Sequence, residues 1–164
     1  MVSRGIILRE ATIEDCDDIY HWRNDSETRE QSFNSKKISY KEHCQWIKKA
    51  LEDTGKLFYI GLDDKNEKCG IVRFDMRGEI SAEINVNVPS QNRGKGIGSQ
   101  LISRSCALFF SETGKKLILA RIKESNTASI KVFQKVGFSE IFRYNGITGG
   151  VVVFVLLASS EIGN

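Results

Sequence analysis

Proline and long apolar runs are both scarce in this sequence. Pro89 is the only proline in 164 residues, which argues against long linkers and disordered arms. The most apolar run, residues 151–158, has eight residues, whereas a membrane-spanning helix needs about twenty. We therefore expect a buried strand there and no association with a membrane. Residues 1–10 form too short and too polar a stretch for a secretory signal.

Metal-binding cysteine patterns and a strong charge of one sign are missing as well. Cys16, Cys44, Cys69 and Cys106 are widely spaced, with no C-x-x-C pair and no histidine at zinc-ligand spacing. We therefore expect no metal site, and mostly buried, reduced thiols in a cytoplasmic protein. The net charge of +3, from 24 basic and 21 acidic residues, is too small to indicate a nucleic-acid partner. It is compatible with a local basic patch for a phosphorylated ligand.

Strand-like and helix-like patterns alternate along the chain and predict one α/β domain, residues 1–164, with a mixed sheet. The clearest strand is 80–88, where apolar residues at 84, 86 and 88 alternate with polar residues at 83, 85 and 87. The other predicted strands are 6–11, 57–62, 69–77, 117–122, 138–144 and 151–157. Four helices are predicted, two of them after Thr12 and Ser39 and two over 97–110 and 126–136.

Two capping boxes mark helix starts in the N-terminal half. Thr12 lies three residues before Asp15, and Ser39 lies three residues before Glu42, so each pair can satisfy backbone groups at a helix N-terminus. We expect the polar residues 23–26 to break the first helix and an irregular segment to continue through residue 33. The second helix is expected to end at residue 55, a glycine.

A glycine-rich loop, VPSQNRGKGIG at residues 88–98, joins the fourth predicted strand to a helix. Glycines let backbone N–H groups turn outward and let a phosphate approach closely. The helix N-terminus behind them adds the positive end of a dipole, and Arg93 and Lys95 add charge. The loop therefore predicts a cradle for a diphosphate.

Two common phosphate-binding motifs do not fit this loop. A P-loop requires G-x-x-x-x-G-K-[ST], but no glycine lies five positions before Gly94, and neither Ser nor Thr follows Lys95. A Rossmann fingerprint requires a glycine at position 99, where Ser99 stands, and an acidic residue at a strand end about twenty positions later. The strand before the loop is also the fourth, not the first.

The pattern that fits is Gln91-x-x-Gly94-x-Gly96, which resembles the pyrophosphate loop of the GNAT superfamily of N-acetyltransferases. Downstream, residues 126–138 (NTASIKVFQKVGF) resemble the second cofactor segment of the same family. The resemblance covers nearly the whole chain, including the order of its strands. It implies the GNAT fold, an α/β fold with a central mixed sheet of about seven strands, flanked by helices and splayed between strands four and five.

The resemblance also implies acetyl-CoA as the cofactor. Pantetheine is expected to fill the splay beside Asn87 and Val88, and the pyrophosphate to take backbone N–H groups of the loop. Helical spacing places Asn126, Ser129 and Phe133 on one face, toward the pantetheine and the acetyl group. The implied cofactor-binding residues are Asn87, Val88, Gln91, Asn92, Arg93, Gly94, Lys95, Gly96, Ile97, Gly98, Asn126, Ser129 and Phe133.

The chemistry that the resemblance implies is direct attack of a neutral amine on the thioester in a ternary complex. It requires orientation, removal of a proton and polarisation of the carbonyl, for which a backbone N–H near Val88 is suitable. Glu83 is the expected base, acting through water; a salt-bridged strand residue is the alternative. Many family members have Tyr where this chain has Phe133, which cannot protonate the leaving thiolate. Ser129 and Tyr144 are the expected substitutes.

A run of uncommon residue types between 22 and 46, WRND…R..SFNS..IS..EH..W, offers a clue to the acceptor. It resembles the acetyltransferases that act on UDP-linked 4-amino sugars in pseudaminic acid and related nonulosonate pathways. The resemblance implies a nucleotide-sugar acceptor, with uracil stacked on an aromatic plane and the diphosphate paired with arginine. The expected substrate-binding residues are Arg23, Asn24, Phe33, His43, Trp46 and Asn85.

Structural roles for these residues stay open. Trp22 and Trp46 also fit a hydrophobic core, His43 fits a hydrogen-bonded structural histidine, and Arg23 fits a residue that only holds its loop together. The apolar final strand is compatible with a monomer or a homodimer.

Two other functions stay open as well. A protein N-terminal acetyltransferase, like those that modify ribosomal proteins, favours an acidic acceptor groove. Residues 23–49 instead contain more basic than acidic side chains, which favours an anionic acceptor. A non-catalytic CoA-binding module is the second alternative, and Phe133 is its main support.

Overall fold

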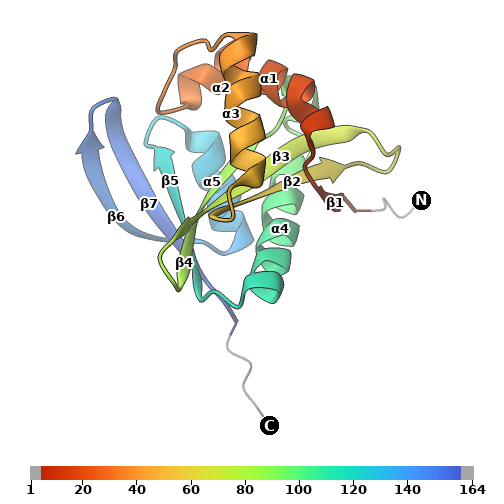
Figure 1. Cartoon of the computed structure of the whole chain (residues 1–164). Coiled ribbons are helices and arrows are strands. Elements are labelled where there is room, and N and C mark those ends of the chain that lie inside the picture. Colours follow the sequence, from red (N-terminus) through yellow and green to blue (C-terminus); the bar gives the residue numbers. More distant parts are fainter. Residues whose placement is uncertain (1–4, 160–164) are drawn as a thin grey trace.

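The computed structural model describes residues 5–159, in which a seven-stranded sheet is flanked by helices (Figure 1). Residues 1–4 and 160–164, the ends of the predicted domain, lie outside the described part. The strands are β1 (Ile7–Glu10), β2 (Lys56–Leu62), β3 (Lys68–Arg77), β4 (Ser81–Asn87), β5 (Leu117–Lys123), β6 (Ser139–Gly146) and β7 (Gly149–Leu157). Their order in the sheet is β1-β2-β3-β4-β5-β7-β6.

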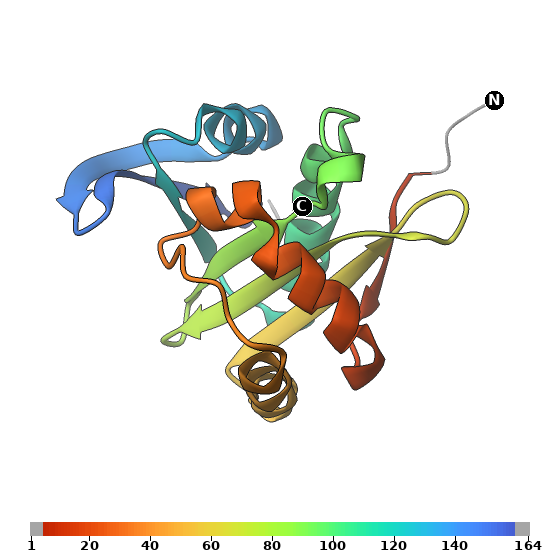
Figure 2. The ribbon, with the colours of Figure 1, turned by 90° about the horizontal axis from the view of Figure 1, so that it is seen from above.

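Helices cover both faces of this sheet. Seen from above, α1, α2 and α3 lie on one face, and α4 and α5 lie on the other (Figure 2). Within residues 5–159, no helix is long and apolar enough to cross a membrane. The helices are α1 (Cys16–Asn24), α2 (Ser26–Gln31), α3 (Tyr40–Glu52), α4 (Ile97–Thr113) and α5 (Thr127–Val136), with 3-10 turns η1 (Ile13–Asp15) and η2 (Ser90–Asn92).

The sheet is mixed, as the sequence predicts, because β4 and β5 run parallel while the other described neighbours are antiparallel. β4 and β5 pair only where Ser81–Glu83 lies beside Leu117–Leu119. Beyond these residues β4 continues to Asn87 and β5 to Lys123 without pairing with each other. The predicted GNAT fold, with its splay between the fourth and fifth strands, is confirmed.

Both predicted capping boxes are present. Thr12 and Asp15 close one at η1, which leads into α1. Ser39 and Glu42 close the other, since the Ser39 N–H donates to the Glu42 carboxylate over 2.9 Å and the Glu42 N–H donates to the Ser39 hydroxyl over 3.3 Å. Helix α3 ends at Glu52, earlier than the glycine at which the sequence places its end.

The prediction of an irregular segment through residue 33 is wrong, because residues 26–31 form α2. The Asp25 side chain caps this helix by accepting the Thr28 N–H over 2.9 Å. None of its six residues is buried, so the apolar periodicity that reveals an amphipathic helix is missing. Polar contacts to Asn87, Arg93 and Lys123 hold α2 in place instead.

Close packing of α4 against the sheet fixes the position of the glycine-rich loop. Leu101 of α4 is fully buried, and its methyl groups lie where side chains at Gly61 and Gly70 would stand. A Cβ at Gly61 would lie 2.3 Å from Leu101, and one at Gly70 would lie 2.6 Å from it. Helix α4 can approach β2 and β3 this closely only because both positions are glycine, and its N-terminus is thereby held at the end of β4.

The cysteines are free thiols, three of them buried and Cys44 partly exposed. Burial raises the pKa of Cys69 to about 11 and that of Cys106 to about 12. The Cys16 and Cys44 sulfur atoms lie 3.2 Å apart between α1 and α3. The prediction of mostly buried thiols is confirmed.

A buried carboxylate ties the start of α1 to the sheet. Asp15 is fully buried and accepts hydrogen bonds from Arg9 over 2.7 and 2.8 Å. Lys68 lies 2.7 Å from the same carboxylate, and the Thr12 N–H donates to it over 2.9 Å. Burial alone would raise the pKa of Asp15, but the bonds from Arg9, Lys68 and Thr12 outweigh it and hold this pKa well below its usual range.

We expect Asp15→Asn to reduce the free energy of unfolding by about 3 kcal/mol at pH 7, because two cations would lose a buried partner. Since the folded-state pKa of Asp15 is lowered, its stabilisation is complete above about pH 4 and declines as the pH falls further. The difference between wild type and variant should therefore shrink in acid. Urea unfolding at pH 7 and at about pH 3 measures both effects.

The matched control is Glu14→Gln, at the neighbouring exposed position, which should change the free energy of unfolding by less than about 0.5 kcal/mol. Equal losses in Asp15→Asn and Glu14→Gln would contradict the anchoring role of Asp15.

Candidate active site

Two adjoining cavities open where β4 and β5 separate. The first, of about 840 Å³, lies between the polar face of the sheet and α1–α3; we call it the acceptor cavity. The second, of about 430 Å³, lies between the end of β4, the glycine-rich loop and α5; we call it the cofactor cavity. They are continuous, because Thr28, Gln31, Ser32, Val86, Asn87, Asn126, Ser129 and Phe133 line both.

The glycine-rich loop has the geometry of an anion cradle. Gly94 and Gly96 have φ values of 73° and 76°, and a Cβ at either would meet no atom within 4 Å. Gly96 forms the N-cap of α4, which starts at Ile97. The first N–H groups of a helix have no partner within the helix, and the positive end of the helix dipole lies at the same end. Gly98 and Ser99 in the first turn of α4 line the cofactor cavity. The loop therefore fits an anionic group such as a diphosphate.

Nine of the predicted cofactor-binding residues line the cofactor cavity, and four lie outside it. Gln91 and Asn92 form part of η2, Lys95 is exposed at the outer side of the loop, and Ile97 begins α4 and packs partly into the core. The residues that line it are Asn87, Val88, Arg93, Gly94, Gly96, Gly98, Asn126, Ser129 and Phe133.

Arg93 has a different role from the free phosphate-binding charge that the sequence suggests. Its guanidinium forms ion pairs with Asp25, over 3.2 Å, and with Glu27. It also donates to the Thr28 hydroxyl over 2.8 Å and to the Val88 carbonyl over 2.9 Å. Arg93 thus joins the glycine-rich loop to α2.

Helix α2 spans the splay and is held on both sides of it. On the β4 side, the Thr28 hydroxyl donates to the Asn87 side chain over 3.4 Å and accepts a hydrogen bond from Arg93 over 2.8 Å. On the β5 side, the Lys123 ammonium donates to the Glu30 carbonyl over 2.7 Å. These contacts fix α2 above the line where the two cavities meet.

Helix α5 presents its first turns to both cavities. The Asn126 side chain caps the helix by accepting the Ser129 N–H over 3.1 Å. Ser129 and Phe133 follow on the same face, and Phe133 is only 4% exposed. This is the arrangement that helical spacing predicts for the acetyl end of the cofactor.

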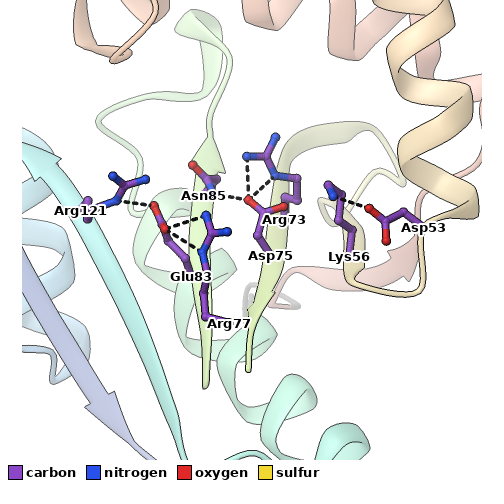
Figure 3. Close-up of polar contacts among 8 residues, drawn as sticks. All are labelled: Asp53, Lys56, Arg73, Asp75, Arg77, Glu83, Asn85 and Arg121. Atoms are coloured by element: carbon purple, nitrogen blue, oxygen red, sulfur yellow. Dashed lines mark hydrogen bonds and ion pairs between the residues drawn. The ribbon is translucent and has the colours of Figure 1, made fainter. Parts of the chain in front are cut away.

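The floor of the acceptor cavity is the polar face of β3, β4 and β5. Asp75 accepts from Arg73 over 2.8 Å and from Asn85 over 3.1 Å, which fixes both side chains at the cavity (Figure 3). Asn85 therefore lies where the sequence predicts a contact with substrate. Arg121 also lines the cavity and stacks over Phe33, with 5.6 Å from its central carbon to the ring centroid.

Glu83, the expected base, lies deeper on the same face and lines neither cavity. One carboxylate oxygen accepts from Arg77 over 3.1 Å and the other accepts from Arg121 over 2.8 Å (Figure 3). Both oxygens are thus occupied by guanidinium groups. This is the salt-bridged strand residue that the sequence leaves open as the alternative.

The two expected proton donors lie in different surroundings. Ser129 lines both cavities. Tyr144 lies on β6 beside Arg121, is 39% exposed and lines neither cavity. Of the two hydroxyl groups, Ser129 is therefore the one that lies at the junction of the cavities.

Arg23 and Asn24 differ in their relation to the acceptor cavity. Arg23 lines it and donates from Nη2 to the Asn34 carbonyl over 2.6 Å, while its buried Nη1 has no partner among the described residues. Asn24 does not line it. Its amide makes two 3.0 Å bonds with the backbone of Ile38, so it holds the loop rather than a ligand.

His43 combines a structural and a ligand-facing nitrogen. It is 1% exposed, and its Nε2 lies 3.0 Å from the Cys16 carbonyl, which can only accept. Burial lowers the pKa of His43, so the neutral ring carries its proton on Nε2. The buried Nδ1 is then an acceptor without a donor among the described residues, in a side chain that lines the acceptor cavity.

The two tryptophans also differ. Trp22 is 8% exposed and belongs to the core beneath α1 and α3. Trp46 is 40% exposed and lines the acceptor cavity, with the Arg73 guanidinium 5.7 Å from its ring centroid. Of the two, only Trp46 offers an aromatic surface to a ligand.

More basic than acidic side chains line the acceptor cavity, and of the basic ones Arg73 and Arg121 are paired with Asp75 and Glu83, which do not line it. Glu42 is the one carboxylate among the described residues that line it, and it is occupied in the capping box of α3. The cationic side chains that line the cavity are Arg23, Lys36, Lys37, Arg73, Arg121 and Lys123. The cavity therefore favours an anionic ligand.

Sequence reasoning missed several cavity residues. The cavity residues of α2 were missed because the helix itself was not predicted, although Asp25, three residues before Thr28, is a capping signal. Arg121 and Lys123 could have been found, because they alternate with apolar residues on β5 and face the same side as Asn85 on the neighbouring strand.

Comparison with known proteins agrees with this geometry. Residues 6–139 match the Acetyltransferase (GNAT) domain family. Acetyltransferase PseH of Campylobacter jejuni is 23% identical over 121 residues, which cover 74% of each chain.

Two solved structures are similar to the whole chain. The spermidine N-acetyltransferase from Vibrio cholerae, in complex with CoA and spermine, has a TM-score of 0.85 at 20% identity, covering 93% of this chain and 95% of the other. The aminoglycoside acetyltransferase AAC(6')-Ib, in complex with coenzyme A, has a TM-score of 0.80 at 20% identity, covering 93% and 95%. The chain thus belongs to the GNAT family and is an N-acetyltransferase whose acetyl donor is acetyl-CoA.

Proposed function

We propose that this enzyme acetylates the primary amine of an anionic acceptor, the 4-amino group of a UDP-linked amino-deoxy sugar. The observation that carries the proposal is the charge of the acceptor cavity. Arg23, Lys36 and Lys37 have no ion-pair partner among the described residues, and the one carboxylate that lines the cavity, Glu42, is already hydrogen-bonded. A nucleotide diphosphate offers negative charge for these cations, and its base offers a plane for Trp46. The likeness to acetyltransferase PseH supports acetyl transfer.

Polyamine acetylation is the second candidate, favoured by the structural likeness to a spermidine N-acetyltransferase. A polyamine carries several positive charges, so its binding site needs carboxylates. Arg23, Lys36 and Lys37 have no ion-pair partner among the described residues, and they would repel such a ligand. The same charge disfavours an acceptor with basic peptide side chains, as in acetylation of protein N-termini.

The proposed contacts with the acceptor use buried atoms that have no hydrogen-bond partner among the described residues. Arg23 Nη1 is a donor for a phosphate or carbonyl oxygen, and His43 Nδ1 is an acceptor for a hydroxyl or imide N–H. At the junction of the cavities, Ser129 is the hydroxyl that we expect to protonate the leaving thiolate, since Phe133 cannot. Glu83 keeps Arg121 in place, and the amine loses its proton to water.

The acceptor class is tested by acetyl transfer to a UDP-4-amino-4,6-dideoxy-N-acetylhexosamine, to spermidine and to an Ala-started peptide. We expect thiol release and a mass gain of one acetyl group with the sugar nucleotide only, because only this acceptor matches the cavity charge. Transfer to spermidine alone would contradict the anionic acceptor but retain the fold and the acetyl donor.

Arg23→Ala should raise the KM for the sugar nucleotide about tenfold or more and change kcat much less, because it removes a contact made in both ground and transition states. Steady-state kinetics in the acceptor concentration measures this. The matched control is Arg104→Ala on the exposed side of α4, outside both cavities, for which both constants should stay within about twofold. A KM unchanged by Arg23→Ala would argue against a diphosphate contact there.

Phe133→Tyr should retain affinity for CoA within about threefold, because its ring borders both cavities and a para hydroxyl can project into them. The added donor beside the thiolate should leave kcat unchanged or raise it. Isothermal titration with CoA and steady-state kinetics check the two statements. A large loss of CoA affinity would mean that Phe133 does not lie at the acetyl end.

A further inference from the structure

Gln31, the last residue of α2, lies at the junction of the two cavities and lines both. Its Oε1 atom is buried and has no hydrogen-bond partner among residues 5–159. A buried amide oxygen without a donor is unfavourable and is rare in folded proteins. Its position in a cavity wall indicates that a ligand supplies the donor.

Three neighbouring polar groups at the junction already have partners. The Thr28 hydroxyl accepts from Arg93 and donates to Asn87, and the Ser32 hydroxyl donates to the Thr28 carbonyl over 2.7 Å. The Asn126 oxygen accepts the Ser129 N–H. Among the described residues that line both cavities, Gln31 thus supplies the one buried acceptor atom without a donor.

The position of Gln31 is fixed by the contacts that hold α2 across the splay. Arg93 and Asn87 hold Thr28 on one side, and Lys123 holds the Glu30 carbonyl on the other. Gln31 directly follows this second anchor. Because a side chain on a fixed helix loses little further freedom when it binds, Gln31 can orient a ligand group at low entropic cost.

No free carboxylate competes for this role among the described cavity residues. Glu42 of the acceptor cavity is bonded to Ser39, and Glu27 of the cofactor cavity is paired with Arg93. Glu83 lines neither cavity. An amine that enters the junction therefore meets a neutral amide oxygen rather than a carboxylate.

We propose that Oε1 of Gln31 accepts a hydrogen bond from an N–H of the acceptor amine. This bond directs the lone pair of the amine nitrogen at the acetyl carbon. As the N–C bond forms and the thioester C–S bond breaks, positive charge develops on the nitrogen, and the hydrogen bond strengthens. An amide is not a base, so the proton that the amine loses passes to water. The leaving thiolate is protonated separately, by the Ser129 hydroxyl. The inference rests on the proposed function only in requiring an amine acceptor.

The test compares Gln31→Leu, which removes the acceptor atom at similar size, with Gln45→Leu on the exposed side of α3, outside both cavities. Kinetics use the amine that wild type acetylates fastest among the sugar nucleotide, spermidine and peptide. We expect Gln31→Leu to lower kcat about thirtyfold, with CoA affinity and melting temperature unchanged. Gln45→Leu should stay within about twofold of wild type.

The variant Gln31→Glu distinguishes a hydrogen bond to the amine from a purely structural role of Gln31. Its carboxylate still accepts the N–H, so this variant should recover a large part of the kcat that Gln31→Leu loses. A kcat for Gln31→Leu within about twofold of wild type would overturn the proposal. So would a parallel loss of CoA affinity or melting temperature, which would make Gln31 a packing residue.

The acceptor panel distinguishes this inference from the proposed function. If wild type prefers spermidine and Gln31→Leu still loses kcat, the nucleotide-sugar assignment fails and the role of Gln31 stands. If the sugar nucleotide is the acceptor and Gln31→Leu is unaffected, the assignment stands and the role of Gln31 fails.

Discussion

The separation of β4 from β5 is the constraint on which the rest of the structure depends. Parallel pairing stops after Glu83 and Leu119, which leaves backbone groups of both strands without sheet partners at the centre of the molecule. Such an opening is stable only if other elements fix the position of strands β1–β4 relative to strands β5–β7. β5 stays paired with β7 along its length, and α4 locks against β2 and β3 through Leu101, so each half is rigid by itself.

The bridge between the halves is polar rather than hydrophobic. Helix α2 buries no residue, yet Arg93, Asn87 and Lys123 attach it to the loop, to β4 and to β5. Hydrogen bonds and partly exposed ion pairs of this kind contribute less stability than a packed core, but together they fix the position of α2 between the two halves. The bridge also places Thr28 and Gln31 of α2 in the walls of both cavities.

The elements that bury apolar surface could be predicted from the sequence, and the acceptor wall could be predicted only in part. Alternation along 80–88, the capping boxes and the glycine-rich loop all correspond to observed structure. Helix α2 has no apolar stripe, so periodicity could not reveal it. The pairing of Glu83 with Arg77 and Arg121 could not be foreseen either, because it depends on residues from three strands that only the folded sheet brings together.

The cofactor half and the acceptor half of the site are determined by different parts of the chain. The loop, the splay and α5 meet the same acetyl donor whatever the acceptor, and a fold shared with enzymes of different acceptors at about 20% identity is the expected consequence. About half of the residues that line the acceptor cavity lie between residues 19 and 46, outside the strands of the sheet. Within this segment Arg23, Lys36 and Lys37 have no ion-pair partner among the described residues, so their charge does not hold the sheet together. For this reason the charge of that wall, rather than the overall likeness of fold, is the better guide to the substrate.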